Sequence, residues 1–323
     1  MAECMDLIIE PHTEDHDDSW DMFCEKAYMA TFLHTRRFLS YHGDRFTDLS
    51  LQVTMGKQIL GIFPAALDPV DQGCVVSHPG ITYGGLLHAG KLRGESMVEA
   101  LHAVCCFYRD SGYDRLVYKT VPLVYHQAPS GDDLYGLFRL GARRFRCDLS
   151  CAIDLSNRLP PSGRRKRSLN KARRSGVEVR TADRTEISGL WHVLEENLGR
   201  KHDVHPVHSL DEIIGLANRF PGSIEFVIAL LDGNIEAGVV LFRTPTAFHA
   251  QYIAASKLAN ANSLLDAVFD DCINRAVETG VRYFDFGVSN EDQGRVLNRG
   301  LYGFKSEFGG GGIVHEFYEI TLN

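Results

Sequence analysis

Residues 248–287 constrain the fold more than any other segment, because they predict a strand, a short turn, a long helix and a second strand in direct succession. Residues 248–255 are rich in aromatic and β-branched side chains, which favour a strand. Apolar residues from 264 to 276 recur at steps of three and four, which predicts a helix with one buried face, and Gly280 is expected to end it. Residues 281–286 are the next expected strand. This order predicts a domain in which helices pack on a sheet.

The connection between the first strand and the helix is a candidate anion site. Residues 256–262 are small or polar, which predicts a loop, and Ser263 is expected to cap the helix. The first backbone N–H groups of a helix lack partners and carry the positive end of its dipole, so they attract phosphate groups. Plain connections in α/β domains have the same features, so a purely structural turn is the alternative.

Two motifs that follow carry a resemblance to a known family. Phe-Asp-Phe-Gly at 284–287 is followed by Tyr-Gly-Phe-Lys-Ser-Glu-Phe-Gly at 302–309 and by an expected last strand at 313–320. This order resembles the C-terminal half of a GNAT acyltransferase domain. Within that superfamily it resembles the FemAB-like branch, whose members share Phe-Asp-Phe-Gly and Tyr-x-Phe-Lys-x-x-Phe-Gly patterns. The stretches 35–43 and 77–85 also resemble segments of that branch.

The chain is long enough for two domains, because its 323 residues exceed the usual size of a single core. The N-terminal half repeats the order of the C-terminal half. After hairpin strands, it predicts a helix, a strand, a short helix and a strand at 94–111, 115–120, 134–139 and 146–155. The resemblance therefore implies an α+β or α/β fold of two tandem GNAT-like domains, each a mixed twisted sheet flanked by helices. We expect domain 1–157 to lack a donor site and contribute to the acceptor cleft, and domain 158–323 to hold acyl-CoA.

The donor site is implied by the resemblance. In GNAT enzymes, the turn before the long helix holds the pyrophosphate of coenzyme A, and backbone groups of the preceding strand face the thioester carbonyl. These groups are expected at Ile253 or Ala254. The remaining donor-binding residues are expected to be Lys257, Asn260, Ala261, Asn262, Ser263, Asn298 and Lys305. The sequence departs from the glycine-containing signature of GNAT turns, because residues 257–263 include no glycine.

Candidate catalytic residues follow from the chemistry of acyl transfer. An amine that attacks a thioester must lose a proton. Strand alternation predicts that His249, Gln251 and Ile253 share one face, so we expect His249 to reach the amine and Gln251 to contact the substrate. Asp285 lies at the carboxyl end of the neighbouring strand, where α/β proteins bind ligands. The resemblance implies that Tyr302 protonates the thiolate. For His249, Asp285 and Tyr302, a structural role within the core is the alternative.

A histidine-rich segment at 202–209 precedes the next expected helix. Its spacing would suit zinc, but no cysteine or further carboxylate stands at a convincing distance, so we expect no metal. We expect His205 to contact the substrate and His208 to transfer protons.

The segment 74–87 combines three glycines and a proline with His78 and Tyr83, which makes an ordinary strand improbable. We expect a functional loop in which His78, Tyr83 and Gly84 bind the substrate. A bulged edge strand is the alternative.

A basic stretch interrupts an otherwise acidic chain. Seven of the eleven residues at 164–174 are Lys or Arg, whereas the net charge of the protein is −8. We expect a short helix whose apolar contacts are Leu169 and Ala172, and in which Arg173 and Arg174 bind a phosphate-bearing substrate. Nucleic acid, a nucleotide-linked substrate and the 3′-phosphate of coenzyme A would all satisfy such a helix. A solvated interdomain helix is the alternative, and the acidic net charge argues against general nucleic-acid binding.

The leading functional hypothesis is an N-acyltransferase. The resemblance implies transfer of an acetyl or 3-hydroxybutyryl group from acyl-CoA to the amino group of a dTDP-linked sugar, for O-antigen, lipopolysaccharide or capsule synthesis. A Fem-type peptidoglycan ligase that uses aminoacyl-tRNA is the second hypothesis, although the chain lacks the long helical insertion usual in those ligases. A non-catalytic GNAT pair that only binds ligands is the third.

Composition places further limits on the protein. Hydrophobic residues make up 44% and charged residues 24%, as in ordinary globular proteins. The eight cysteines form no Cys-x-x-Cys pair, so we expect reduced thiols rather than a metal site. The sequence contains no apolar run of membrane-spanning length and no signal-like start. We therefore expect a cytoplasmic monomer or weak dimer that does not insert into membranes and that binds small molecules, with no nucleic acid as partner.

Overall fold

The computed structural model describes residues 6–202 and 206–322. It divides the chain into two compact units. Unit 1 contains Met1–Asp148, Asn290–Val296 and Val314–Asn323, and unit 2 contains Leu149–Ser289 and Leu297–Ile313. Each unit combines sheet and helices. The functional roles expected for domains 1–157 and 158–323 stay predictions.

Unit 2 is built on a mixed sheet with the strand order β8-β13-β12-β11-β10-β9. Its strands are β8 (Arg143–Asp154, from Leu149 onward in this unit), β9 (Glu178–Thr181), β10 (Ile224–Leu231), β11 (Asn234–Arg243), β12 (Ala247–Ala255) and β13 (Tyr283–Val288). The β10–β11 hairpin and the β11–β12 pair are antiparallel, whereas β12 and β13 are parallel. A parallel pair needs a crossover connection, and the segment after β12 supplies it.

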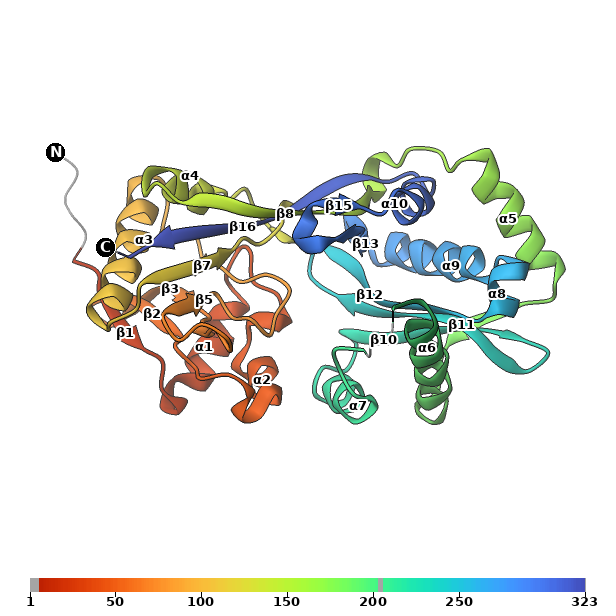
Figure 1. Ribbon diagram of the computed structural model, residues 1–323, viewed down its shortest axis with the longest axis horizontal. Coiled ribbons are helices and arrows are strands. Elements are labelled where there is room, and N and C mark those ends of the chain that lie inside the picture. The colour runs from red at the N-terminus through yellow and green to blue at the C-terminus, as the bar shows by residue number, and fades with distance from the viewer. Residues whose placement is uncertain (1–5, 203–205, 323) are drawn as a thin grey trace. The chain divides into compact units, whose positions relative to one another are not determined.

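Helices cover both faces of this sheet (Figure 1). They are α5 (Gly163–Arg174), α6 (Ile187–His202), α7 (Leu210–Arg219), α8 (Lys257–Asn262), α9 (Leu264–Thr279) and α10 (Arg299–Ser306). Helix α9 packs on one face together with α5, and α6 packs against β11 and β12 on the other. The sequence predicted α9 from its apolar spacing and a short helix at the basic stretch that forms α5, and both are confirmed.

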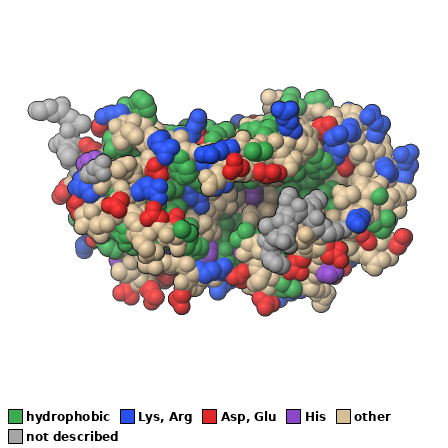
Figure 2. Space-filling view, in the orientation of Figure 1, with side chains coloured by type: hydrophobic (Ala, Val, Ile, Leu, Met, Phe, Trp, Pro, Cys, Tyr) green, Lys and Arg blue, Asp and Glu red, His purple; other side chains and the backbone are tan. Residues whose placement is uncertain are grey.

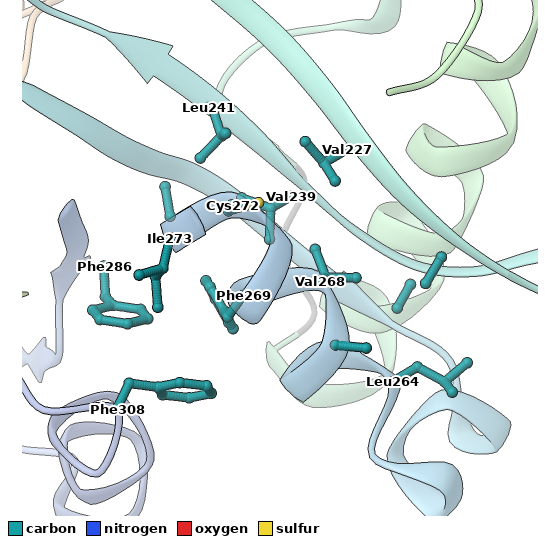
Figure 3. Close-up of a cluster of buried hydrophobic side chains, with 14 of the residues drawn as sticks. Val227, Val239, Leu241, Leu264, Val268, Phe269, Cys272, Ile273, Phe286 and Phe308 are labelled. Atoms are coloured by element: carbon teal, nitrogen blue, oxygen red, sulfur yellow. The ribbon is translucent and has the colours of Figure 1, made fainter. Parts of the chain in front are cut away.

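The core of unit 2 is centred on the buried face of α9 (Figure 3). Phe269 lies with its ring centroid 5.0 Å from that of Phe286 and 5.4 Å from that of Phe308. Val268, one residue before Phe269, and Ile273, four residues after it, are also fully buried. The buried face of α9 therefore has the spacing of three and four residues that the sequence predicted. Gly280 ends the helix in the left-handed conformation with a φ of 74°.

The prediction of a loop at 256–262 is wrong, because Lys257–Asn262 form helix α8 and Ser256 is its N-cap. The Ser256 side chain caps it by accepting a hydrogen bond of 2.9 Å from the Ala259 backbone N–H, and Ala259 is fully buried. Ser263 precedes α9 as expected but makes no side-chain cap, since its backbone is left-handed with a φ of 62°. Ser263 alone therefore connects α8 to α9. The small and polar residues of this segment do not indicate such a connection.

Unit 1 holds a sheet with the strand order β1-β2-β3-β6 and a set of neighbouring strands with the order β4-β5-β7-β16. The strands are β1 (Ile8–Pro11), β2 (Leu51–Met55), β3 (Gln58–Phe63), β4 (Ala66–Leu67), β5 (Cys74–Val76), β6 (Leu87–His88), β7 (Arg115–Lys119) and β16 (Gly311–Thr321, from Val314 onward in this unit). The short strands β14 (Asn290–Glu291) and β15 (Val296–Leu297) follow β13. The helices are α1 (Asp17–Cys24), α2 (Arg36–Leu39), α3 (Glu95–Asp110) and α4 (Asp132–Arg139). The predicted β2–β3 hairpin and the predicted helices at α3 and α4 are confirmed. Among the described residues, no helix combines the length and apolar character needed to cross a membrane.

The left-handed residues at the two ends of α9 give opposite stability predictions. Ser263→Gly should raise the free energy of unfolding by about 1 kcal/mol, because glycine adopts a positive φ without the Cβ penalty. Gly280→Ala should lower it by about 1 kcal/mol, since a Cβ there meets nothing within 4 Å and only the backbone conformation is penalised. Urea unfolding of both variants measures the changes. Equal destabilisation by both substitutions would show that Ser263 is held by its side chain.

Candidate active site

The central feature of unit 2 is a gap between two parallel strands. β12 and β13 pair only from Ala247 to His249 and from Tyr283 to Asp285, although β12 continues to Ala255 and β13 to Val288. The strands therefore separate just beyond His249 and Asp285. The separation leaves one edge of β12 without a neighbouring strand.

A β-bulge at the start of the gap redirects the side chains of β12. Ala250 pairs with Leu241 and Tyr252 with Val240, so Gln251 is the extra residue. Before the bulge, Phe248 and Ala250 point into the core under α9, and after it Ala255 does so, with Ile253 packed beside it. The predicted alternation is therefore wrong: Ile253 does not share the face of His249. The sequence could not reveal this, because a bulge is fixed by the pairing of two strands.

The same ladder fixes the direction of the backbone groups. The Ser256 N–H donates to the Glu236 carbonyl of β11 over 2.8 Å, and alternate residues of an antiparallel ladder bond to the same neighbour. Ala254 therefore also faces β11. Ile253 and Ala255 face the opposite edge, from which β13 has separated. Of the two backbone groups expected to face the thioester, that of Ile253 points toward the gap and that of Ala254 does not.

Asp285 is fully buried at the point of separation. Its Oδ2 accepts a hydrogen bond of 2.9 Å from His249 Nδ1, and its Oδ1 accepts one of 2.9 Å from the Gly287 N–H. The Ser150 hydroxyl donates to Oδ1 as well. A buried carboxylate requires such partners, because desolvation without them would be costly.

This arrangement orients His249 for proton transfer. When Nδ1 donates to the carboxylate, the other ring nitrogen, Nε2, is left as the acceptor, and the carboxylate stabilises the imidazolium that forms. The His249 side chain is 14% exposed. Ser150 is not an activated nucleophile here, because its hydroxyl bonds to the carboxylate and not to the imidazole. The sequence analysis missed Ser150, since its place opposite Asp285 depends on the β8–β13 pairing.

A buried lysine supports the bulge that follows Asp285. Lys305 Nζ donates to the carbonyls of Gly287 and Val288 over 2.8 and 2.7 Å. Burial lowers the pKa of Lys305 to about 8, whereas the nearby Asp285 carboxylate raises it. Gly287 has a φ of 76°, which only glycine adopts without strain. Lys305, expected to bind the donor, thus holds the backbone beside the dyad.

A second pair of polar side chains joins β12 to the loop before α7. His208 Nδ1 lies 2.5 Å from the Tyr252 hydroxyl, and the Trp191 ring of α6 meets the Tyr252 ring edge-on at 5.2 Å. Burial raises the pKa of Tyr252 to about 12, so it remains a phenol. The catalytic role of His208 stays a prediction, and Tyr252 is a partner that strand periodicity alone did not single out.

The start of α9 differs from the anion site that the sequence predicted there. Asp266, in the first turn, is buried and pairs with Arg165 of α5 at 2.8 Å. Burial raises the pKa of Asp266 to about 6 despite the opposing effect of Arg165. The side-chain amides of Asn260 and Asn262 donate to carbonyls one turn back within α8, and Lys171 donates to the Ala261 carbonyl. The donors of this segment are therefore largely used within the protein.

The basic helix α5 has two kinds of cation. Arg165 is buried and also pairs with Glu307 at 3.1 Å, while Arg173 forms an exposed pair with Asp270 at 3.0 Å. Among the residues that the structure describes, none forms an ion pair with Lys166, Arg167 or Arg174, and all three are exposed. Figure 2 shows Lys and Arg side chains gathered over this helix. Leu169 and Ala172 make the apolar contacts that the sequence predicted.

The other predicted donor-site residues occupy α10 and the exposed side of α8. Tyr302 is partly buried against the core under α9, and burial raises its pKa. Asn298 caps α10 by accepting a hydrogen bond of 3.0 Å from the Leu301 N–H. Lys257 is exposed at the first position of α8. Their binding roles stay predictions.

The predicted substrate residues of unit 1 lie in a tightly packed loop. His78 and Tyr83 are 4% and 3% exposed, and a Cβ on Gly84 would lie 2.2 Å from the Ser77 carbonyl oxygen. Lys119 Nζ donates to the carbonyls of His78, over 3.1 Å, and Ile81. His205 lies outside the described residues. Within the described part of the chain, no three His, Cys, Asp or Glu side chains are grouped to hold a metal ion, and the absence of a metal stays a prediction.

Lys119 gives a prediction about pH. Burial, with a smaller effect of Arg146, lowers its pKa from 10.5 to about 7. Between these values the unfolded chain binds more protons than the folded one, so the contribution of Lys119 makes stability rise with pH in that window. Lys119→Met should remove this contribution. The variant's free energy of unfolding relative to wild type should therefore fall as pH rises from 7 to 10. A difference that stays constant would contradict the lowered pKa.

Arg165 gives a prediction about the α5–α9 contact. Arg165→Met should cost about 3 kcal/mol, because it leaves the buried Asp266 carboxylate without its partner. The matched control is Arg164→Met, whose guanidinium is 59% exposed in its pair with Glu307 and should cost less than about 1 kcal/mol. Guanidinium unfolding at neutral pH measures both. Similar losses in the two variants would mean that burial of the Arg165–Asp266 pair is unimportant.

Comparison with known proteins agrees with this geometry. Residues 162–295 match the Acetyltransferase (GNAT) domain family. No curated protein sequence matches the chain.

Three solved structures share its fold. FemX has a TM-score of 0.70 at 12% identity, with 99% of this chain and 98% of FemX covered. L-PGS from Bacillus licheniformis has a TM-score of 0.59 at 15% identity, over 87% of this chain and 86% of that one. A tandem GNAT protein from the clavulanic acid biosynthesis pathway has a TM-score of 0.53 at 12% identity, over 98% and 99%. The predicted fold class is confirmed: the chain has the fold of FemX and of the tandem GNAT protein, and its residues 162–295 match the acetyltransferase (GNAT) domain family.

Proposed function

We propose that this protein is an N-acyltransferase in which the His249–Asp285 dyad takes the proton from an attacking amine. The observation that carries the proposal is the dyad itself, placed where β12 and β13 separate. A partly exposed imidazole held by a buried carboxylate is an effective general base. The GNAT family match over residues 162–295 supports the same reaction class.

The chain's own groups have separate tasks in this reaction. The amine nitrogen attacks the acyl carbonyl, and His249 Nε2 accepts the proton that the nitrogen loses. Asp285 keeps the imidazole in the required tautomer and stabilises its positive charge. The backbone N–H group of Ile253, at the open edge of β12, donates to the carbonyl oxygen as it becomes negative. Tyr302 or solvent returns a proton to the leaving group.

Acyl-CoA is the donor we propose first. Its acyl end would lie along the open edge of β12, and its phosphates would meet the start of α9 with Lys257 and Ser263. The fit of these residues is partial, because α8 replaces an open loop and Asp266 adds a carboxylate that Arg165 must neutralise. Coenzyme A supplies an activated acyl group as a thioester, and the protein supplies its orientation and the base.

The acceptor we propose is a nucleotide-linked amino sugar, such as a dTDP-amino sugar used in surface polysaccharide synthesis. Lys166, Arg167 and Arg174 support a phosphate-bearing substrate, because their charges have no ion-pair partner among the described residues. Arginine side chains bind phosphate oxygens in a bidentate manner. We place the reaction in the cytoplasm and the protein as a monomer or weak dimer.

A specific observation favours a second candidate, a Fem-type ligase that uses aminoacyl-tRNA. The segment expected to bind pyrophosphate is helix α8, and its side-chain amides bond within that helix. A donor without a pyrophosphate at this point would not need an open loop. The full-length fold similarity to FemX agrees with this candidate.

The first test is a substitution series in the dyad. His249→Ala and Asp285→Asn should each lower kcat by roughly 10²- to 10⁴-fold, the usual contribution of a general base. Their KM values should change little, because neither group is proposed to bind the ground-state substrate. The matched control is His192→Ala, an exposed histidine of α6 that should leave the rate unchanged. Full activity in His249→Ala would exclude the dyad as the base.

The identity of the acyl donor distinguishes the acyl-CoA-dependent transferase from the Fem-type ligase. Purified protein is assayed for thiol release from acetyl-CoA and 3-hydroxybutyryl-CoA with a dTDP-amino sugar, and in parallel for transfer from charged tRNA. Turnover of acyl-CoA supports the first candidate, and turnover of aminoacyl-tRNA alone supports the second. Binding of donor or acceptor by calorimetry without turnover of either would show a non-catalytic GNAT pair.

A further inference from the structure

Helix α5 presents a row of basic side chains on the surface of unit 2. Arg165 and Ala172 mark its inward side, where both are buried. Arg167, Lys171 and Arg174 stand at positions i, i+4 and i+7, so they share one side of the helix. This side is two positions, or about half a turn, away from the buried one. All three side chains are exposed, and Figure 2 shows the Lys and Arg side chains over this helix.

The charges of this helix are only partly neutralised. Seven of its 12 residues are Lys or Arg. Among the described residues, their ion-pair partners are three carboxylates, those of Asp266, Asp270 and Glu307. Four positive charges therefore remain, and Lys257, exposed at the start of the neighbouring helix α8, adds a fifth. This concentration of positive charge contrasts with the net charge of −8 of the whole protein.

The unpaired cations are spread along the helix. Lys166 and Arg167 precede Arg174 by eight and seven positions, which is roughly 11 Å along the axis at a rise of 1.5 Å per residue. They form an extended row and do not surround a single point. Such a row fits a partner that carries many phosphates. The pyrophosphate of the proposed acceptor would account for only part of it.

Exposed leucines lie beside the basic row. Leu159, which is 64% exposed, stands four positions before α5 begins. Leu258, which is 47% exposed, lies on α8, a helix that packs against α5. The Ala261 carbonyl, three positions further along α8, accepts a hydrogen bond of 2.5 Å from Lys171. Aliphatic side chains next to Lys and Arg are typical of surfaces that bind the headgroup region of a bilayer.

The composition of the two helices favours a bilayer over a nucleic acid. Proteins bind single-stranded nucleic acid by combining cations with aromatic side chains on which the bases stack. Neither α5 nor α8 contains an aromatic residue. The exposed side chains beside the cations are aliphatic instead, and these gain free energy from contact with lipid.

We propose that α5 and α8 form a docking surface for a bilayer that contains anionic phospholipids. The Lys and Arg side chains donate hydrogen bonds to the lipid phosphates, and the two leucines contact the boundary between headgroups and acyl chains. The association is peripheral, because both helices stay outside the hydrocarbon core. The inference is independent of the acyltransferase proposal, since vesicle binding is measured without turnover.

The test is sedimentation of the full chain with lipid vesicles at low ionic strength. We expect binding to vesicles of equimolar phosphatidylcholine and phosphatidylglycerol, no binding to phosphatidylcholine alone, and release at high salt. The combined substitution of Lys166→Gln, Arg167→Gln and Arg174→Gln should weaken vesicle binding roughly 100-fold, because each basic residue near an anionic membrane contributes about fivefold. Leu159→Ser combined with Leu258→Ser should weaken it roughly tenfold.

Three arginines of unit 1 provide a matched control. Arg139, Arg143 and Arg144 are exposed and each pairs with a glutamate. Their combined replacement by glutamine removes the same charge from the protein as the α5 variant. It should change vesicle affinity less than about threefold, because paired charges outside the docking surface are screened by salt.

Four outcomes would overturn the proposal. Absence of binding to anionic vesicles would remove the docking surface, and equal losses in the α5 variant and the unit 1 control would show only an effect of overall charge. Wild-type vesicle affinity in the leucine variant, with tighter binding to RNA, would assign the row to a nucleic acid. Displacement from vesicles by a dTDP-amino sugar would assign it to the acceptor. Circular dichroism verifies the folding of each variant, and if the α5 variant does not fold, the leucine variant decides.

Discussion

The buried carboxylate of Asp285 is the constraint on which the rest of unit 2 depends. A fully buried charge is tolerated only with several partners, and here strands β8 and β12 and the bulge of β13 each supply one through Ser150, His249 and the Gly287 N–H. The carboxylate thus ties together three strands at the point where two of them part. The bulge of β13 follows directly after Asp285, and the β12–β13 pairing ends at this residue. The same contacts that satisfy the buried charge also orient the imidazole.

Two buried cations complete this framework. Lys305 donates to the Gly287 and Val288 carbonyls at the bulge of β13. Arg165 joins α5 to both Asp266 and Glu307, and its guanidinium lies 4.7 Å from the centroid of the Phe304 ring. Lys305, which the sequence analysis assigned to donor binding, therefore also has a structural role. The cations of α5 without ion-pair partners remain the stronger candidates for contact with a phosphate.

Elements with a long, regular pattern could be predicted from the sequence. Helix α9 follows from apolar spacing and Gly280, and the β10–β11 hairpin follows from two apolar runs around a short polar turn. His249 and Asp285 could be named as a candidate pair because each stands on a predicted strand of the same segment. Helix α8 could not be predicted in this way. Its six residues are too short for a periodic signal, and it forms because Ser256 caps it and Ala259 is buried.

The sequence by itself determined the order of strands and helices, the buried face of α9 and the residue types available for acyl transfer, because these depend on local periodicity and composition. Only the tertiary structure decided which face each side chain of β12 occupies, since the bulge at Gln251 arises from pairing with β11. The tertiary structure also determined that the Ser150 hydroxyl donates to the Asp285 carboxylate, and that Arg165 forms a buried ion pair with Asp266. These contacts join residues more than 100 positions apart, and no local pattern records which distant partner will satisfy a buried charge.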